Sequence, residues 1–380
     1  SATDIQGVVE LAKKLFADLV VVAPDDPLVA GMVDALNAAG FATFGPNAAA
    51  AIIEGSKVFS KNLMLKYNIP TAEYKVFDNP ADVLAYVKEK NEFPTVIKAD
   101  GLALGKGVII PETLEEAENG VREIMEDKIF GESGNNVVVE EFLTGPEVSV
   151  LAFTDGKCVK PMVSSMDHKR ALDGDKGLNT GGMGTVSPNP YYTADIAKEC
   201  MEKIFIPTID AMNKEGRTFK GCLYFGLMLT PKGPKVIEYN CRFGDPETQV
   251  VLPRLKTDII DIFEAINNGT LAELDIEWAD EACACIIAAS GGYPKSYPKG
   301  IEITGLENGQ KDGVIVYHAG TAIKDGKLVT SGGRVLGVTA LGSDLQQALD
   351  KAYAALGEIH FDNMHFRHDI GKKALAALNK

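Results

Sequence analysis

The chain has 380 residues, of which 46% are hydrophobic, and a formal net charge of -15 at pH 7. This length predicts two or three domains of about 150 residues each. The acidic balance argues against a nucleic-acid partner, since a polyanion would be repelled. No apolar run reaches the length of a membrane helix, and the chain starts without a basic-then-apolar leader, so we expect a cytoplasmic protein.

The first 54 residues predict a partial α/β domain. Residues 7–16 have helical periodicity, "LVVVA" at 19–23 predicts a buried strand, and 27–39 predicts a second helix before "FATFG". A helix that opens such a domain needs a sheet beneath its apolar face. We therefore expect an upstream strand and phosphate loop that are missing from this chain.

Two further domains are predicted, at 55–270 and 271–380. The first has a small lobe at about 70–143. Its predicted elements are a helix in "EGSKVFSKNLMLKY", strands at 94–98, 106–110, 137–142 and 147–153, a helical stretch at 193–214 and the hairpin "CLYFGLMLTPKGPKVIEYN". The last domain is predicted to be strand-rich, around "CACIIAA", "VIVYHAG" and "GGRVLGVTA", with a helix at 343–357.

The stretch "VIKADGLALGKGVII" predicts a hairpin with a glycine-rich turn. It is not a Walker A loop, because three residues rather than four separate Gly101 from Gly105, and Gly107 rather than Ser or Thr follows Lys106. With Lys98 at its start, it fits a flap that closes over a triphosphate. A solvated glycine hairpin explains the pattern equally well.

The stretch "VIEYNCRFGDPE" predicts a cation site. Glu238 and Asn240 lie two residues apart on a strand, so both face one side and offer oxygen ligands to a hard cation. Arg242 has the same parity and could hold a phosphate or carboxylate. Asp245 and Glu247 follow in a loop. A strand with a merely polar face is the alternative, but so many charged groups are costly without a ligand, which favours a metal–nucleotide site.

Neither the cysteines nor the histidines add a second metal site. The six cysteines show no CxxC pair and are expected to be reduced and mostly buried. Three histidines cluster in "HFDNMHFRH" near the end of the chain. Without a second ligand cluster, a polar surface is the favoured interpretation there.

Six motifs in order carry a family resemblance: "EGSKVFSK", "IKADGLALGKGV", "DHKR", "NTGGMG", "EYNCRFGDPETQ" and "SGGRVLGVTA". Together they resemble the glycinamide ribonucleotide synthetase family of the ATP-grasp superfamily, nearly from Ala2 to Lys380. The resemblance implies an α/β and α+β chain with an ATP-grasp fold between a partial Rossmann-like domain and a strand-rich C-terminal domain. It implies ATP-dependent ligation of glycine to 5-phosphoribosylamine through glycyl phosphate, with Mg²⁺ or Mn²⁺. Whether the chain belongs to a larger purine-synthesis polypeptide or assembly stays open.

The resemblance also implies roles for individual residues. Nucleotide contacts are implied for Lys61, Lys98, Gly105, Lys106, Gly107, Glu140, Glu141, Phe142, Leu143 and Glu147. Substrate contacts are implied for Asp167, His168, Lys169, Asn179, Thr180, Gly181, Gly182, Met183, Gly184, Asp245, Glu247 and Arg334. Glu238 and Asn240 would bind the metal, and Arg242, Lys98 and Arg334 would be catalytic.

Two departures from the family pattern bear on the site. Asp25 stands in "APDDPL" where the family has a glutamate, and Gly226 stands near the position of a second acidic metal ligand. Another ATP-grasp ligase or a biotin-carboxylase-like enzyme would share the nucleotide site, but "DHKR" with "NTGGMG" argues against both. A nucleotide-binding regulatory module without catalysis is the remaining rival, and the intact Arg242, Asp245 and Glu247 argue against it.

Overall fold

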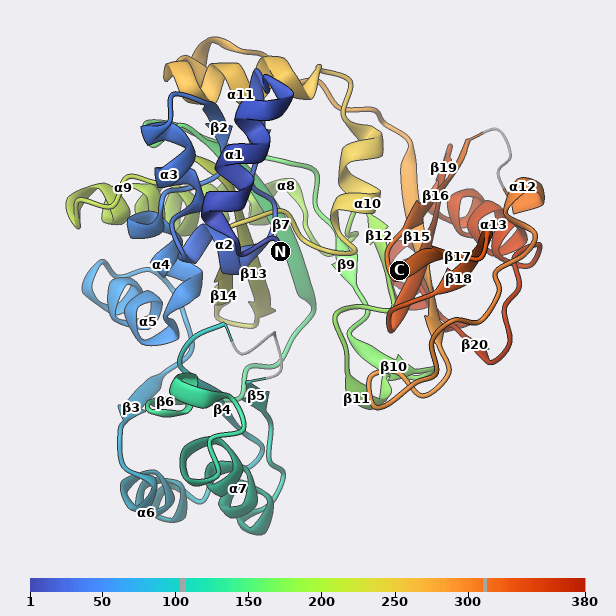
Figure 1. Ribbon diagram of the computed structural model, residues 1–380. Helices are drawn as coiled ribbons and strands as arrows, with labels where there is room; N and C mark the ends of the chain where they lie inside the picture. Colours follow the sequence, from blue (N-terminus) through green and yellow to red (C-terminus); the bar gives the residue numbers. More distant parts are fainter. Residues whose placement is uncertain (103–106, 310–312, 380) are drawn as a thin grey trace.

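The computed structural model describes residues 1–102, 107–309 and 313–379. Figure 1 shows an N-terminal and central body at the upper left, a small lobe below it, and a strand-rich C-terminal body at the right. Gly105 and Lys106 of the predicted flap lie outside the described residues. Within the described ranges, no helix is long and apolar enough to cross a membrane.

The first 66 residues place helices around a two-stranded sheet. The elements are α1 (Ile5–Leu15), β1 (Leu19–Val21), α2 (Asp25–Val29), α3 (Met32–Ala38), β2 (Ala42–Phe44), α4 (Ala48–Gly55) and α5 (Lys57–Lys66). β1 and β2 pair in parallel, as in a fragment of a doubly wound sheet. The single helix predicted over 27–39 is wrong. Gly31, at φ +91°, separates α2 from α3, because a residue in the left-handed region does not continue a right-handed helix.

The small lobe is an antiparallel sheet in the order β3-β6-β4-β5 with two helices packed on it. Its elements are β3 (Tyr74–Phe77), α6 (Pro80–Lys90), β4 (Thr95–Ala99), β5 (Val108–Ile109), α7 (Leu114–Val121) and β6 (Val137–Glu141), with a π-helical turn at Arg122–Glu126 and a 3-10 turn at Gly131–Gly134. Alternate residues of β4 and β6, such as Ile97 and Val139, pack against Val83 and Val121 of the helices. The opposite face of this sheet, which carries Lys98 and Glu140, turns to the rest of the molecule.

The central body contains a second antiparallel sheet in the order β14-β13-β7-β8. Its strands are β7 (Glu147–Thr154), β8 (Val159–Pro161), β13 (Gly221–Thr230) and β14 (Gly233–Asn240). The predicted helical stretch is α8 (Ala194–Cys200), a π-helical turn Met201–Phe205 and α9 (Ile206–Lys214). Successive residues of β7 and β13 belong to two different hydrophobic clusters, so both faces of the sheet are buried.

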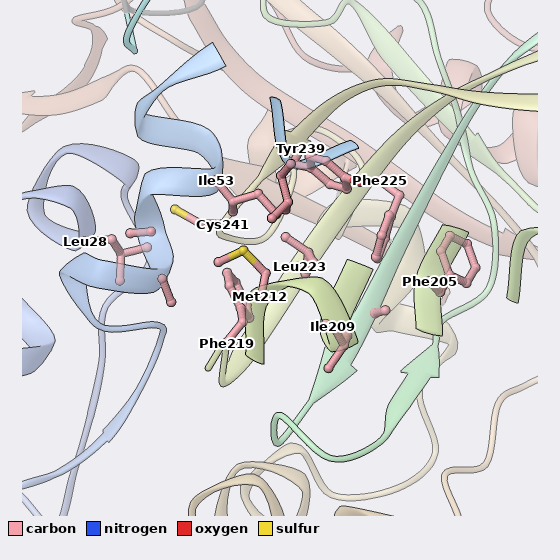
Figure 2. Close-up of a cluster of buried hydrophobic side chains, with 14 of the residues drawn as sticks. Leu28, Ile53, Phe205, Ile209, Met212, Phe219, Leu223, Phe225, Tyr239 and Cys241 are labelled. Atoms are coloured by element: carbon pink, nitrogen blue, oxygen red, sulfur yellow. The ribbon is translucent and has the colours of Figure 1, made fainter. Parts of the chain in front are cut away.

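Figure 2 shows the larger of these two clusters, which joins the N-terminal helices to the sheet. Leu28 and Ile53 come from the N-terminal helices, and Leu223 and Phe225 come from β13. This shared core fixes the N-terminal helices against β14, whose far end carries Glu238 and Asn240. The position of α4 and α5 relative to the predicted cation ligands is therefore set by packing.

The remaining elements belong mainly to the C-terminal body. They are β9 (Met166–Asp167), β10 (Arg170–Leu172), β11 (Lys176–Asn179), β12 (Gly184–Ser187), α10 (Thr248–Val251), α11 (Ile259–Asn268), β15 (Ala282–Ser290), α12 (Leu306–Gly309), β16 (Val314–His318), β17 (Thr321–Lys324), β18 (Lys327–Thr330), β19 (Arg334–Gly342), α13 (Leu345–Leu356), β20 (Met364–His365) and α14 (Lys372–Leu378), with 3-10 turns at Leu252–Arg254 and Leu271–Glu273.

One sheet contains strands from distant parts of the chain. Its order is β16-β19-β15-β12-β9, with β20 also paired to β15. β9 and β12 come from residues 166–187, within the predicted 55–270 domain, whereas β15, β16 and β19 come from the predicted 271–380 domain. The predicted boundary at 270 stays a prediction. The motifs "DHKR" and "NTGGMG", which border β9 and β12, are thereby placed beside the C-terminal strands.

Candidate active site

A cavity of about 320 Å³ lies where the small lobe, β14 and the "NTGGMG" segment meet. Most of the predicted site residues line it: Lys61, Lys98, Gly107, Glu140, Glu141, Phe142, Leu143, Glu147, Lys169, Asn179, Thr180, Gly181, Glu238, Asn240, Arg242, Asp245 and Glu247. Asp167, His168, Gly182, Met183, Gly184 and Arg334 are not among the lining residues in the described part of the chain. One cavity thus brings together the predicted nucleotide, metal and substrate residues.

Two buried lysines and one glutamate line the cavity on the side of the small lobe. Glu140 on β6 lies between Lys98 of β4, at 3.0 Å, and Lys61 of α5, at 3.3 Å. Lys61 also donates to Thr71 Oγ1 at 2.7 Å and to Ala72 O at 3.2 Å, and it is only 2% exposed. Burial lowers the pKa of Lys61 to about 8, although Glu140 opposes that shift. Two cations against one carboxylate leave a positive excess, which suits a polyanionic ligand.

Lys57 is a third lysine of this site that sequence reasoning missed, although it lies in the quoted motif "EGSKVFSK". Its Nζ donates to Gly101 O at 2.6 Å and its side chain lines the cavity. Burial lowers the pKa of Lys57, and Glu238 opposes that effect. Ser56 caps α5 by accepting from Phe59 N and donates to Asp100 Oδ1 at 3.0 Å. The start of α5 is thereby tied to the strand that leads into the predicted flap.

Both predicted cation ligands, Glu238 and Asn240, line the cavity at the end of β14. Burial disfavours the charged form of Glu238, but Lys169, Lys98 and other nearby cations outweigh burial and lower the pKa of this carboxyl group. Gly226 pairs directly with Glu238 across β13 and β14. A Cβ at Gly226 would come within 3.2 Å of Glu238 Cγ, so the missing second acidic group has little room beside this ligand.

Arg242 connects the cation site to the N-terminal body. Its Nη2 lies 3.2 Å from Asn240 Oδ1, 3.2 Å from Glu54 Oε1 and 3.8 Å from Asp25 Oδ2. Glu54 also accepts from Cys241 N at 2.7 Å. Burial raises the pKa of Glu54, and Arg242 opposes this effect. Glu54 was missed because its partners lie nearly 190 residues further along the chain.

The edge of the cavity next to β6 contains the residues predicted to hold an adenine. Glu141 Oε1 accepts from Lys235 Nζ at 2.6 Å and from Glu73 N at 3.1 Å. The backbone N–H of Glu141 donates to Glu73 O at 3.0 Å, so this N–H is already used. Phe142 and Leu143 follow the end of β6 and line the same edge.

At the opposite end, a buried carboxyl group is surrounded by hydroxyls. Glu247, 3% exposed, accepts from Tyr224 Oη at 3.0 Å and from Ser149 Oγ at 3.3 Å. Burial, together with Asp167, raises the pKa of Glu247 despite Lys169. Lys169 Nζ lies 2.9 Å from Asp167 Oδ2. Tyr224 and Ser149 line the cavity but carried no recognisable sequence motif, since they lie in apolar strands.

Several residues of "DHKR" and "NTGGMG" do not line the cavity in the described ranges but lie next to residues that do. His168 is buried, its Nδ1 lies 3.0 Å from Gly184 O, and its Nε2 accepts from Gly371 N at 3.1 Å. Burial lowers the pKa of His168. Met183 is fully buried. Gly182 has φ +116°, and a Cβ there would lie 2.4 Å from Pro246 Cδ. Both ring nitrogens of His168 are thus occupied by backbone groups.

Arg334, at the start of β19, does not line the cavity in the described part of the chain, but its guanidinium binds two residues that do. It donates to Gly181 O and Asp245 O, each at 2.8 Å, and to Asp245 Oδ2 at 2.9 Å. Among the described residues, no group of three or more His, Cys, Asp or Glu side chains could hold a metal ion. Glu238 and Asn240 fit a hard cation by their oxygen donors, with room in the coordination sphere for ligand oxygens.

Comparisons with known proteins match most of the chain to one family. Residues 1–54, 55–248 and 283–373 match the N domain, the ATP-grasp (A) domain and the C domain of phosphoribosylglycinamide synthetase. A phosphoribosylamine–glycine ligase of Caldanaerobacter subterraneus is 48% identical over 97% of this chain and 88% of its own. A chicken trifunctional purine biosynthetic protein, adenosine-3, is 50% identical over 95% of this chain and 36% of its own.

Solved structures agree on the fold. The phosphoribosylamine–glycine ligase of Thermotoga maritima has a TM-score of 0.78 and 38% identity, covering 86% of this chain and 81% of its own. The biotin carboxylase domain of 2-oxoglutarate carboxylase from Hydrogenobacter thermophilus, in complex with MgADP, ADP and bicarbonate, has a TM-score of 0.74 at 15% identity, covering 96% and 79%. At that identity the second likeness concerns the fold alone. The predicted ATP-grasp architecture is confirmed, and the chain belongs to the phosphoribosylglycinamide synthetase family.

Proposed function

We propose that the chain is a phosphoribosylamine–glycine ligase, which joins glycine to 5-phosphoribosylamine with conversion of ATP to ADP and phosphate. Close similarity to ligases of this name over nearly the full chain supports the activity. The single structural observation that carries it is a cavity with buried lysines at one end and a carboxyl–hydroxyl network at the other. Such a cavity can hold a triphosphate beside a small amino acid.

The lysine end would bind the nucleotide. Lys61 and Lys98, held by Glu140, would contact the phosphates, with Lys57 beside them. Leu102 and Gly107, two described residues of the predicted flap, line the same cavity. Glu141, Phe142 and Leu143 would face the adenine, and Glu147 would accept from the ribose. Gly105 and Lys106 remain proposed phosphate contacts.

The carboxylate of glycine is a poor acyl donor, so it must be activated before an amine can attack. Transfer of the γ-phosphoryl group to that carboxylate gives glycyl phosphate and ADP. The amine of phosphoribosylamine then attacks the acyl carbon and expels phosphate. Arg242, fixed by Glu54 at 3.2 Å, would neutralise charge on the transferring group. Water must be excluded during this sequence, because the mixed anhydride is easily hydrolysed.

The polar end would receive the other substrates. Lys169, Asn179, Thr180 and Gly181 form one wall of the cavity there, and Asp245 and Glu247 form another part. Asp167, His168, Gly182, Met183, Gly184 and Arg334 would support this end by holding the wall in place. With its ring nitrogens bound to Gly184 and Gly371, His168 would position the wall rather than transfer a proton.

Glu238 and Asn240 would hold Mg²⁺, or Mn²⁺ in its place, and this ion would supply charge neutralisation to the phosphates. The biotin carboxylase neighbour with the same fold contains MgADP, which supports a magnesium nucleotide here. The match to part of the chicken trifunctional protein supports the further proposal that this chain can occur within a larger purine-synthesis polypeptide. We retain the cytoplasmic location as part of the proposal, to be checked by cell fractionation.

The test is release of ADP and phosphate from ATP and Mg²⁺, with glycine and freshly generated phosphoribosylamine omitted in turn. Release that requires both substrates, together with glycinamide ribonucleotide identified by mass spectrometry, is the expected result. ATP binding without turnover under all conditions would instead identify a nucleotide-binding module and overturn the proposal.

A further inference from the structure

One wall of the cavity is the base of a hairpin. We call residues 169–181, which contain β10 and β11, the wall segment. Its two ends line the cavity: Lys169 at the first end, and Asn179, Thr180 and Gly181 at the second. Both the N–H and the Oγ1 of Thr180 donate to Lys169 O, at 2.8 and 2.7 Å. The two ends are therefore joined, and movement of the hairpin would move all four lining residues.

The C-terminal body holds this base at Gly181. Tyr293 Oη accepts from Gly181 N at 3.1 Å, while Arg334 Nη1 donates to Gly181 O at 2.8 Å. Both backbone polar groups of one lining residue are thus bound by side chains that come from outside the wall segment. The approach is close, because a Cβ at Gly181 would lie 2.9 Å from Arg334 Cζ.

A second attachment lies further along the hairpin. The guanidinium of Arg367, in a side chain 1% exposed, donates to Asp369 Oδ1 at 2.8 Å and to Arg170 O at 3.1 Å, and lies 3.0 Å from Asp175 Oδ1. Arg170 is in the first strand of the hairpin and Asp175 is at its turn. A buried guanidinium is stable only when its donors are paired, so this geometry is strongly specified.

Neighbouring residues of the same C-terminal segment reinforce the attachment. His365 Nε2 lies 2.7 Å from Ala171 O, and His368 Nδ1 lies 3.1 Å from Asp173 Oδ2. Gly174 N donates to Asp369 Oδ2 at 2.7 Å. Residues 365–369 therefore contact both the first strand of the hairpin and its turn. Two of the three clustered histidines, His365 and His368, therefore belong to this attachment.

We propose that Tyr293 and Arg367 are positioning residues of the ligase, which set the wall segment against the two substrates other than ATP. The proposal rests on the proposed function, since it assigns Lys169, Asn179, Thr180 and Gly181 to the substrate end. Neither Tyr293 nor Arg367 belongs to the cavity lining within the described ranges, so each acts through the wall segment.

Two variants test the attachments separately. Tyr293→Phe removes the acceptor of Gly181 N and keeps the ring, and Asp175→Asn removes one charge partner of Arg367 while leaving Asp369. The lost acceptor in Tyr293→Phe and the lost charge in Asp175→Asn each predict an increase of about three- to tenfold in the KM for glycine, for phosphoribosylamine, or for both. The KM for ATP should stay at the wild-type value, because in the described part of the chain Lys57, Lys61 and Lys98 make no hydrogen bond or ion pair with the wall segment. The thermal unfolding midpoint should stay at the wild-type value in Tyr293→Phe and fall in Asp175→Asn, because the buried Arg367 loses a charge partner there.

Matched controls are available in the same body. Tyr297→Phe removes a hydroxyl from the same loop, 6.2 Å away between ring centroids, and Glu302→Gln removes the partner of Lys327 at 2.7 Å on the surface. Both should leave every KM unchanged.

Unchanged KM values in Tyr293→Phe and Asp175→Asn would overturn the inference. An equal rise for ATP with a lowered unfolding midpoint would also overturn it, because it would indicate a merely structural role. If Asp175→Asn does not fold, Tyr293→Phe decides alone. A wild-type chain that turns over none of the substrates would overturn the proposed function itself, and the inference with it. This result differs from the two outcomes above, in which the wild-type chain is active.

Discussion

The protonation state of Lys61 gives the sharpest prediction about nucleotide binding. This side chain is 2% exposed, and burial lowers its pKa from 10.5 to about 8. Nucleotide phosphates would supply negative charge next to its Nζ and raise the pKa in the complex. Binding should therefore take up a proton near pH 8, and ATP affinity should be highest below pH 8 and fall as the pH rises above it.

The size of the effect follows from the two pKa values. Every tenfold change in proton affinity corresponds to about 1.4 kcal/mol, so the step from 10.5 to about 8 costs the free protein about 3 kcal/mol. If the phosphates restore the pKa of Lys61 to 10.5 in the complex, ATP affinity falls about tenfold for each pH unit above 8 until the pH reaches that pKa. The pH dependence of folding stability has the opposite sign. Because the unfolded chain binds this proton more tightly, the contribution of Lys61 to the free energy of unfolding rises between pH 8 and 10.5.

Isothermal titration calorimetry of ATP with Mg²⁺ in buffers of different ionisation enthalpy measures this proton uptake directly. We expect about half a proton per ATP at pH 8 and almost none at pH 6.5, because a group with a pKa of about 8 is half charged at pH 8. Lys61→Met should lose the uptake. Lys66→Met, which changes a surface lysine at the end of the same helix, should keep it.

Proton uptake in Lys61→Met equal to that of the wild type would refute this reasoning. So would an ATP affinity that stays constant from pH 7 to about 9.5. Lys57 offers a useful comparison, because burial lowers its pKa as well. Uptake lost in Lys57→Met but kept in Lys61→Met would move the titrating group to Lys57.

Three further predictions concern other parts of the site. Glu238→Gln should reduce kcat about 100-fold and raise the Mg²⁺ requirement in a metal titration, since it removes the one charged cation ligand; an unchanged Mg²⁺ dependence would contradict this role. Arg242→Lys should lower kcat about 100-fold, because an ammonium cannot replace the planar fork, and steady-state rates near wild type would contradict it. Gly182→Ala, with a Cβ 2.4 Å from Pro246 Cδ, should lower the free energy of unfolding in urea by about 2 kcal/mol or more. Gly326→Ala, also at positive φ but with no neighbouring atom within 4 Å, should cost only about 1 kcal/mol; equal losses would show that crowding is not the cause.

The features predicted best from sequence are those with a two-residue period. Glu238 and Asn240, two residues apart on β14, both line the cavity. The hairpin of β13 and β14 is predicted equally well from the sequence. In these strands the local pattern and the tertiary environment agree, so the sequence specifies which side chains share a face.

The helices show where local reasoning was incomplete. α6 was not predicted, although Asn79 followed by Pro80 is a strong helix-start signal and Asn79 does accept from Ala81 N. The break at Gly31 was missed because a single glycine inside a helical pattern is often tolerated. In the structure its positive φ redirects the chain.

Contacts between distant residues could not be read from one sequence. Glu54 meets Arg242 and Cys241, and Arg367 meets Asp175, across nearly 190 residues or more. Nothing in a local pattern distinguishes these charges from solvated surface ones. The pairing of β12 with β15 is of the same kind, because short strands near glycine-rich motifs carry little pattern of their own.

The pairing of β12 with β15 also constrains how the protein can be made. β12 ends at Ser187, but its partner β15 begins only at Ala282, about a hundred residues later. At about 5–20 residues per second, a ribosome would need roughly 5–20 s to supply that partner. During this interval the lysine end of the cavity can already assemble, while the hairpin opposite still lacks its neighbouring strands. A nascent chain should therefore acquire nucleotide binding before it acquires the ability to use the other substrates.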